Sequence, residues 1–111
     1  MNFKRLERAF QAVLERDRVS LNSIELRKHA ISKTIAECNA LLKNNQGISG
    51  DCFENLLRET AFAQHQKQRI LILEQELRSL EIEADAARIL LRQSFGKFSA
   101  LQSLTKLQSK L

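Results

Sequence analysis

The sequence contains no proline, tryptophan or tyrosine, and only three of its 111 residues are glycine. Glycine and proline mark the turns of compact folds that are built from many short elements. Because Gly47, Gly50 and Gly96 stand at only two places, the chain has room for very few turns. This scarcity excludes most all-β and mixed α/β folds. The residues that are present, 43% hydrophobic and 28% charged with 5% aromatic, are typical of long helices.

Long hydrophobic runs are also missing. No stretch approaches the roughly 18 consecutive apolar residues that are needed to span a bilayer, and no secretory signal peptide is recognisable. The two cysteines, Cys38 and Cys52, do not form a disulfide framework and are interpreted as small buried hydrophobic residues. We therefore expect a soluble cytoplasmic protein.

Motifs of enzymes are absent as well. The sequence has no glycine-rich phosphate-binding loop, no nucleophile elbow and no metalloprotease helix motif. A hairpin that folds near residue 48 brings His29 and His65 to similar heights, but zinc sites normally draw three or four protein ligands. We expect no enzyme activity, no catalytic residue, no metal and no cofactor.

A seven-residue repeat runs through the first part of the chain, in alternating steps of four and three residues. Its positions are Phe10, Leu14, Asp17, Leu21, Ile24, Lys28, Ile31, Ile35, Cys38 and Leu42. A stripe this narrow is typical of a coiled-coil seam rather than of the broad apolar face of a globular helix. Upstream, the seam is expected to continue through Leu6 to Phe3 with a local change of step. The pattern predicts a helix over about residues 3–44.

A second seam follows a polar, glycine-containing stretch that suits a turn over about residues 45–51. Asp51 and Glu54 then form a capping-box pattern, which marks a helix start near Cys52. The second seam consists of Ile70, Leu73, Leu77, Leu80, Ala84, Ala87, Leu91, Ser94, Phe98, Leu101 and Leu104. It predicts a second helix over about residues 52–109.

Two long helices joined by one short loop pack as an antiparallel hairpin. We therefore predict an all-α fold, with residues 1–111 forming a single antiparallel coiled-coil hairpin whose second helix is the longer one. A fold at residue 48 places Asp17 near Arg78, as a register-setting pair, and Lys28 near Gln68. In this register about 16 to 18 residues at the end of the second helix overhang. Their apolar side chains then lack an intramolecular partner; these are Phe95, Phe98, Leu101, Leu104, Leu107 and Leu111.

The net charge of +5 collects near the C-terminal end of the sequence. Residues 1–85 hold 13 basic and 13 acidic residues, whereas residues 86–111 hold five basic residues and no acidic one. The preference of helix C-termini for cations covers only the last turn, so we interpret the charge as a docking surface. The predicted partner-binding residues are Lys4, Arg5, Arg8, Arg88, Arg92, Phe95, Lys97, Phe98, Leu101, Leu104 and Lys106.

This basic tip is typical of a helix that enters a groove or ring in another protein. An anionic lipid surface and a frayed terminus are the alternatives for the same residues. Specific nucleic-acid binding is disfavoured because the chain from residue 1 to residue 85 has no net charge, and a basic tip alone gives only salt-sensitive, non-specific binding.

Four stretches carry a likeness to a known family: Phe3-Lys4-Arg5-Leu6, Asn45-Gln46-Gly47-Ile48-Ser49-Gly50, Ala87-Arg88-Ile89-Leu90-Leu91-Arg92-Gln93 and Leu101-Gln102-Ser103-Leu104. With two long helices and a longer, basic second helix, the chain resembles the FliJ-like flagellar export proteins. The central stalk proteins of injectisome type III secretion look similar. The resemblance implies a cytoplasmic stalk whose paired terminal helices insert into the ring of an export ATPase. It also implies contacts with the export gate and with chaperones, and an association with the inner membrane only through these partners.

The sequence thus predicts a non-enzymatic stalk or adaptor of flagellar or type III protein export. Two alternatives come from other classes of protein. One is a structural coiled coil that self-associates by burying the C-terminal stripe against a second copy. The other is a secretion chaperone that binds an export substrate.

Overall fold

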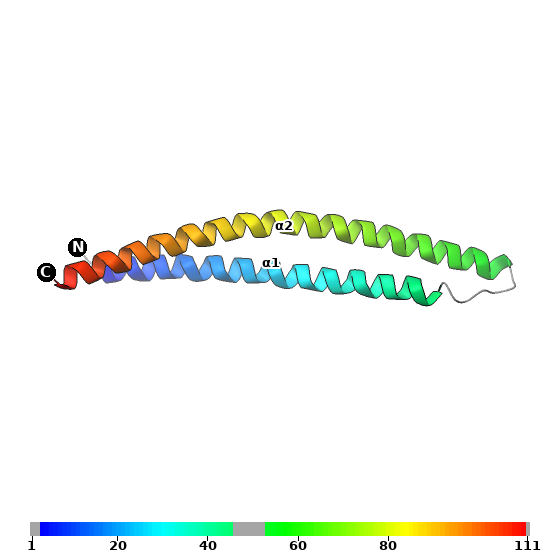
Figure 1. The fold of residues 1–111 in the computed structure, drawn as a ribbon, viewed down its shortest axis with the longest axis horizontal. Helices are drawn as coiled ribbons and strands as arrows, with labels where there is room; N and C mark the ends of the chain where they lie inside the picture. Colours follow the sequence, from blue (N-terminus) through cyan, green and yellow to red (C-terminus); the bar gives the residue numbers. More distant parts are fainter. Residues whose placement is uncertain (1–2, 46–52, 111) are drawn as a thin grey trace. The chain divides into compact units, whose positions relative to one another are not determined.

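Two long helices make up the whole described chain. The computed structural model describes the backbone of residues 3–45 and 53–110, and the side chains of residues 3–44 and 56–110. Helix α1 spans Phe3–Asn45 and helix α2 spans Phe53–Lys110 (Figure 1). The described residues contain no strand, so the predicted all-α hairpin of two long helices is confirmed. The predicted turn and cap, with Asp51 and Cys52, lie outside the described residues.

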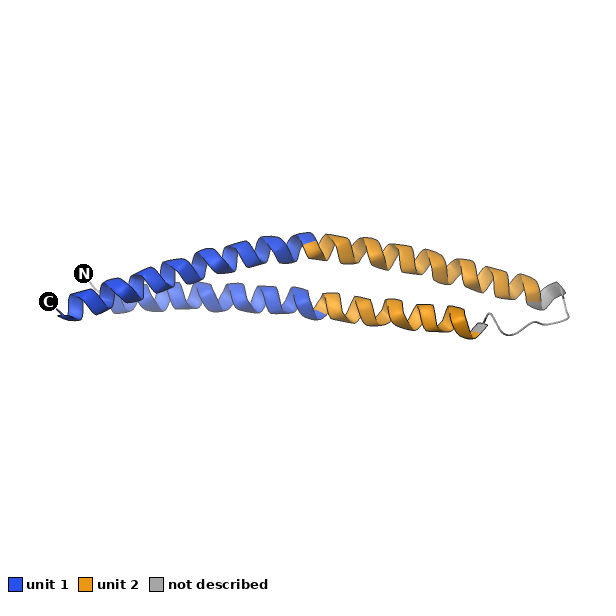
Figure 2. Cartoon of the chain, in the orientation of Figure 1, with its two compact units in different colours: residues 1–26, 82–111 blue, residues 27–81 orange. Residues whose placement is uncertain are grey.

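The contacts between the helices divide the chain into two compact units (Figure 2). Unit 1 consists of Met1–Leu26 and Ile82–Leu111, and unit 2 consists of Arg27–Glu81. Within each unit a segment of α1 lies beside a segment of α2 and runs antiparallel to it. Each unit is therefore a two-helix coiled coil in its own right.

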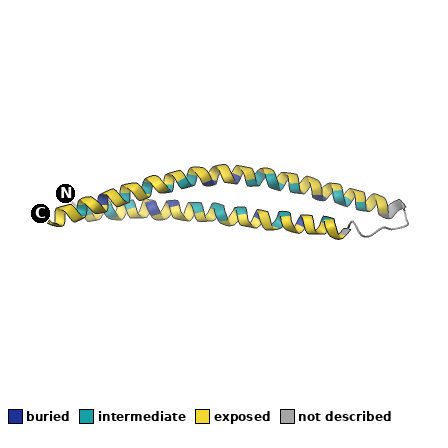
Figure 3. Ribbon diagram, viewed as in Figure 1, coloured by how far each residue is buried: buried dark blue, intermediate teal, exposed yellow. Residues whose placement is uncertain are grey.

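The predicted seam of α1 is confirmed at each of its ten positions, which are buried or half-buried (Figure 3). Upstream of Phe10 the prediction is wrong, because Leu6 is exposed and Glu7 is half-buried instead. The alternating steps of four and three residues therefore continue without interruption to Phe3. An unbroken heptad keeps the seam facing α2 along the whole segment, and the short methylene stem of Glu7 fits there while its carboxylate reaches water.

The seam of α2 is confirmed at every predicted position except the last. Leu104 is 53% exposed, and the neighbouring Thr105 takes the seam position. The Thr105 hydroxyl donates a hydrogen bond of 2.9 Å to the carbonyl of Leu101, which satisfies it at this half-buried site. Continuity of the heptad thus decides the position, although leucine is the more hydrophobic of the two residues.

The predicted pairing of the two helices is wrong by about two heptads. In unit 1 the Ser94 hydroxyl donates a hydrogen bond to the Asp17 carboxylate, so Asp17 does not lie near Arg78. In unit 2 the Lys28 Nζ lies 3.6 Å from Glu81 Oε1, and Lys28 is not near Gln68. Seams that repeat every seven residues match equally well after a shift of one heptad. The register observed is one that gives both charged seam residues a polar partner.

The correction removes the predicted C-terminal overhang. Leu101 is only 6% exposed and Phe98 is half-buried, because the last part of α2 packs against the first part of α1 within unit 1. The excess length of α2 lies in unit 2 instead (Figure 2). From the contact of Lys28 with Glu81, the end of α1 lies level with about residue 64 of α2, and the earlier residues of α2 extend beyond it.

Candidate protein-docking site

One end of unit 1 carries a concentration of positive charge, which we call the basic end. It comprises residues 3–22 of α1 and 89–110 of α2, which lie level in the register set by the contact of Asp17 with Ser94 and whose outer ends lie together (Figure 2). Its acidic residues are Glu7, Glu15 and Asp17, and the last two pair with Arg18 and Arg16. Seven exposed basic residues remain: Lys4, Arg5, Arg8, Arg92, Lys97, Lys106 and Lys110. Within the described part of the chain, no ion pair involves any of these seven. Their charges are therefore free to meet an acidic partner.

Arg88 does not belong to this end, although the sequence placed it there. Its Nη2 lies 2.5 Å from Glu25 Oε1, and its Nη1 lies 2.7 Å from Asp85 Oδ1. The predicted position of Arg88 beside Lys4 and Arg5 is wrong for the same reason as the register. The shift of about two heptads moves Arg88 inward, to the level of Glu25.

The charges on the first turn of α1 oppose the helix dipole. The N-terminus of a helix carries a partial positive charge that favours acidic side chains. The first turn of α1 has no acidic residue, and Lys4 and Arg5 stand there instead. Each unfavourable placement costs about 0.3–1 kcal/mol at low salt. By contrast, Lys110 in the last turn of α2 is favoured by the dipole, so helix stability accounts for Lys110 and not for Lys4 or Arg5.

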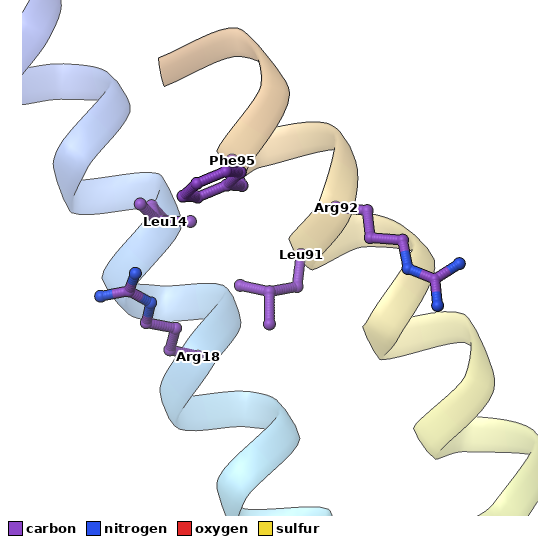
Figure 4. Close-up of a pocket in the computed structure, with 5 residues that line it drawn as sticks. All are labelled: Leu14, Arg18, Leu91, Arg92 and Phe95. Atoms are coloured by element: carbon purple, nitrogen blue, oxygen red, sulfur yellow. The ribbon is translucent and has the colours of Figure 1, made fainter. Parts of the chain in front are cut away.

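A groove with an apolar floor lies between the helices at the inner side of the basic end (Figure 4). Leu14 from α1 meets Leu91 and Phe95 from α2 at its centre. The guanidinium groups of Arg18 and Arg92 point away from this centre on opposite sides. Phe95 remains more than half exposed although its ring lies against Leu14. The groove therefore offers an apolar contact between two arginines, of which Arg18 is paired with Glu15, while Arg92 has no ion pair within the described residues.

A second groove of unit 1 is lined by Phe10, Val13, Ser94 and Lys97. Val13 from α1 is partly exposed there, and Lys97 from α2 supplies the cation. Both grooves lie close to Ser94 along α2. Apolar surface beside basic side chains therefore occurs more than once within the basic end.

The structure separates the predicted apolar docking residues into two groups. Phe95 and Leu104 are exposed, whereas Phe98 and Leu101 pack in the seam against α1. Sequence reasoning missed Val13 and Arg18, which line the grooves. Their signal is their position beside the seam of α1, and it becomes readable only when the register is known.

The remaining candidates lie in unit 2. His29 and His65 do not lie level, since Lys28 contacts Glu81 and His65 is 16 residues earlier in α2. Among the described residues, no group of three or more histidine, cysteine or acidic side chains is placed to hold a metal ion. Cys38 is a buried free thiol in the seam.

The fold and the site define a class of protein: a helical coiled-coil hairpin with one strongly basic end. Compared with protein-family models, with curated proteins and with solved structures, the chain gives no match. Neither described helix contains a segment apolar enough, over sufficient length, to cross a membrane.

Proposed function

We propose that the chain is a non-enzymatic coiled-coil stalk or adaptor of a bacterial flagellar or type III protein-export apparatus. Its basic end docks into the ring of the export ATPase and contacts the export gate. The family resemblance of the sequence supplies the identity of these partners, and the structure supplies the surface. The observation that carries the proposal is the set of unpaired cations on the basic end, two of which stand against the dipole of α1.

The charge distribution supports a docking end rather than a uniformly basic rod. Unit 1 holds ten basic and six acidic residues, and unit 2 holds eight and seven. Three of the six acidic residues of unit 1 lie outside the basic end, and two of the three within it pair with Arg16 and Arg18. A patch of one sign at one place steers an oppositely charged partner and fixes its orientation.

Charge reversal on α1 tests the proposal. The variant Lys4→Glu/Arg5→Glu/Arg8→Glu introduces acidic residues near the N-terminus of α1, where the dipole favours them, so the helix is expected to stay folded. The measurements are co-sedimentation with the export ATPase of the same bacterium and stimulation of its ATP hydrolysis. We expect the loss of both, with unchanged helicity by circular dichroism.

The matched control reverses three exposed cations of unit 2, with Arg58→Glu/Lys67→Glu/Arg69→Glu. It changes the net charge by the same amount and is expected to keep both ATPase binding and stimulation. Equal effects of the two variants would show a dependence on net charge only and would overturn the assignment of the basic end. Full stimulation by the first variant would do the same.

The structure weakens the reason for the self-assembling alternative. That alternative was based on an apolar C-terminal stripe without a partner; Phe98 and Leu101 pack within unit 1, whereas Phe95, Leu104 and Leu107 stay exposed. Sedimentation of the free protein distinguishes the two, because a stalk is expected to sediment as a 12.8 kDa monomer.

A further inference from the structure

One stripe on the face of α2 that points away from α1 in unit 1 carries no charge. From Ile82, where unit 1 begins in α2, the residues at alternating steps of four and three are uncharged as far as Leu107, and in unit 2 the same spacing is uncharged back to Ala61. We call the set in unit 1 the outer stripe, and it consists of Ile82, Ala86, Ile89, Gln93, Gly96, Ala100, Ser103 and Leu107. All eight are exposed. Positions with this spacing lie opposite the seam on a heptad helix.

A solvated helix face normally carries charged residues. Here Ile82 is 72% exposed, and Ile89 and Leu107 are both more than half exposed. The stripe has the same periodicity as the buried seam, and that periodicity is the one a second helix needs in order to pack along it. It extends over 26 residues, which is a length of about 38 Å. The outer stripe is therefore a second coiled-coil seam without a partner in the described chain.

The equivalent face of α1 does not share this property. Its exposed apolar residues in unit 1 include Val19 and Leu26, but Arg16 stands among them. A helix that packed along α1 would bury the Arg16 charge, which is unfavourable without an acidic partner. Only α2 presents an uncharged stripe of this length.

The residues beside the outer stripe determine which kind of helix fits it. Arg92 and Lys106 flank it on one side and Lys97 flanks it on the other. Glu83 and Asp85 flank only its first turns, and no acidic residue follows Asp85 in α2. In coiled coils the flanking positions choose the partner through their charges. A helix with acidic flanks would pair with all three cations, each of which lacks an ion pair within the described residues.

The size of the central residues also selects the partner. A Cβ built on Gly96 meets no atom within 4 Å, and Ala100 and Ser103 follow on the same face. Small residues leave room for large apolar side chains of another helix. A second copy of this chain would place its small residues opposite the small residues of the first copy. It would also place its Arg92 and Lys97 close to Arg92 and Lys97 of the first copy. A lipid surface would receive little apolar volume from the stretch Gln93–Ser103.

We propose that the outer stripe of α2 binds an amphipathic helix of another protein, with large apolar residues in its seam and acidic residues beside it. The proposal goes beyond docking of the basic end to an export ATPase and does not depend on it. The occupant is a single helix packed antiparallel or parallel to α2 in unit 1, which turns the helix pair into a three-helix bundle there. Its binding follows from burial of the stripe and from pairing with Arg92, Lys97 and Lys106.

The test uses a fluorescein-labelled synthetic peptide of four heptads, with leucine and isoleucine in the seam and glutamate at the flanking positions. Fluorescence anisotropy measures its binding to the full chain. A peptide of the same seam with lysine at the flanks is the matched probe. We expect the glutamate peptide to bind at least about tenfold more tightly than the lysine peptide.

Two variants, each with one new carboxylate, test which face of unit 1 binds the peptide. Ile89→Glu places an acid on the outer stripe, three residues from Arg92, and Val19→Glu places one on the exposed face of α1, three residues from Arg16. Both are exposed positions in unit 1, so both variants are expected to fold. We expect Ile89→Glu to weaken binding of the glutamate peptide at least about tenfold and Val19→Glu to leave it unchanged.

Several outcomes would overturn the proposal. Equal binding of the two peptides, or equal effects of the two variants, would contradict a specific acidic partner on this face. A dimer of the free protein that Ile89→Glu dissociates would assign the stripe to a second copy. Binding to phosphatidylcholine/phosphatidylglycerol vesicles that Ile89→Glu abolishes would assign it to a membrane. All of these variants leave Lys4, Arg5 and Arg8 unchanged, so the result is separate from the ATPase test.

Discussion

Units 1 and 2 are built on the same heptad seam but differ in what their polar seam residues do. In unit 1 the buried Asp17 carboxylate accepts a hydrogen bond from Ser94, and the Arg16 Nη2 lies 3.6 Å from its Oδ1. In unit 2 the buried polar residue is Gln66, whose Oε1 has no hydrogen-bond partner among the described residues. Unit 1 therefore contains a satisfied buried polar contact that unit 2 lacks.

This difference indicates how one register is chosen over others. A slip of one heptad would preserve the apolar contacts of the seam but leave the Asp17 carboxylate without Ser94, at the cost of an unsatisfied buried charge. The buried apolar residues of unit 2, Ile31, Cys38 and Leu80, carry no such penalty. There the contacts that discriminate are the partly exposed ion pairs of Lys28 with Glu81 and of Arg27 with Glu76. We infer that unit 1 sets the pairing of the helices and that unit 2 mainly contributes burial.

The largest expected effect comes from cavities in the two seams. Leu14 in unit 1 is 3% exposed and Ile31 in unit 2 is 8% exposed. Each replacement by alanine is expected to lower the free energy of unfolding by about 2–4 kcal/mol. Hydrogen exchange by mass spectrometry is expected to show faster exchange mainly in unit 1 for Leu14→Ala and mainly in unit 2 for Ile31→Ala. Uniform acceleration in both units by either variant would show that they unfold together.

The second prediction concerns the polar contact of unit 1. Asp17→Leu is expected to raise the free energy of unfolding by about 1–2 kcal/mol, because an apolar residue fits the seam and the Ser94 hydroxyl can bond to a carbonyl of its own helix. It is also expected to broaden or double the amide resonances of unit 1 in NMR spectra, because no buried polar contact then favours one register over another. The control Asp17→Asn keeps a polar group and is expected to keep single resonances. Sharp, single resonances for Asp17→Leu would assign the choice of register to other contacts.

Gly96 gives a smaller, purely local prediction. Gly96→Ala is expected to raise the free energy of unfolding by about 1 kcal/mol, because alanine favours the helix and its Cβ meets no atom within 4 Å. Chemical denaturation measures the change. Ser79→Ala, at an exposed position of α2 in unit 2, is the control and is expected to give about half of this gain. A loss of stability in Gly96→Ala would mean that this position is not an ordinary helical one.

The smallest effects are expected from the ion pairs that cross between the helices. Double-mutant cycles on Glu25 with Arg88 in unit 1, and on Arg27 with Glu76 in unit 2, are expected to give coupling energies of about 0.2–1 kcal/mol. The first pair is the shorter, and Arg88 also contacts Asp85, so we expect it to be the stronger of the two. Both couplings are expected to fall at high salt. A stronger coupling in unit 2 would contradict the role of unit 1 in setting the register.

The sequence was sufficient to predict the helices and nearly all seam residues, because heptad periodicity is a local property. Its two errors at the ends, Leu6 and Leu104, arose from following hydrophobicity where the heptad step continues through Glu7 and Thr105. The periodicity does not determine the register, because every shift of seven residues gives the same seam. Polar contacts such as that of Asp17 with Ser94 determine the register, and they join residues that are 77 positions apart in the sequence.

The candidate site could be predicted in part for the same reason. Charge counting located the basic residues of the last quarter of the sequence without any pairing information. Which of them lie beside the cations of α1 depends on the register, because the predicted pairing leaves the end of α2 as an overhang, whereas the observed pairing brings the first turn of α1 level with about Lys106. The place of Arg88 depends on the register strongly, and the prediction for it was wrong. The outer stripe has the same seven-residue spacing as the seam but became apparent only once the seam was fixed.

Under the proposed docking, the placement of Lys4 and Arg5 at the positive end of the α1 dipole couples binding to local order. In the free protein these charges repel the dipole and loosen the first turn, and added salt screens this repulsion. A partner carboxylate placed there relieves the same repulsion, so binding tightens the turn that it contacts. Salt is therefore expected to order the first turn of the free chain while it weakens the complex. The ordering of the free chain by salt and the weakening of the complex by salt can both be measured on the residues of the first turn of α1.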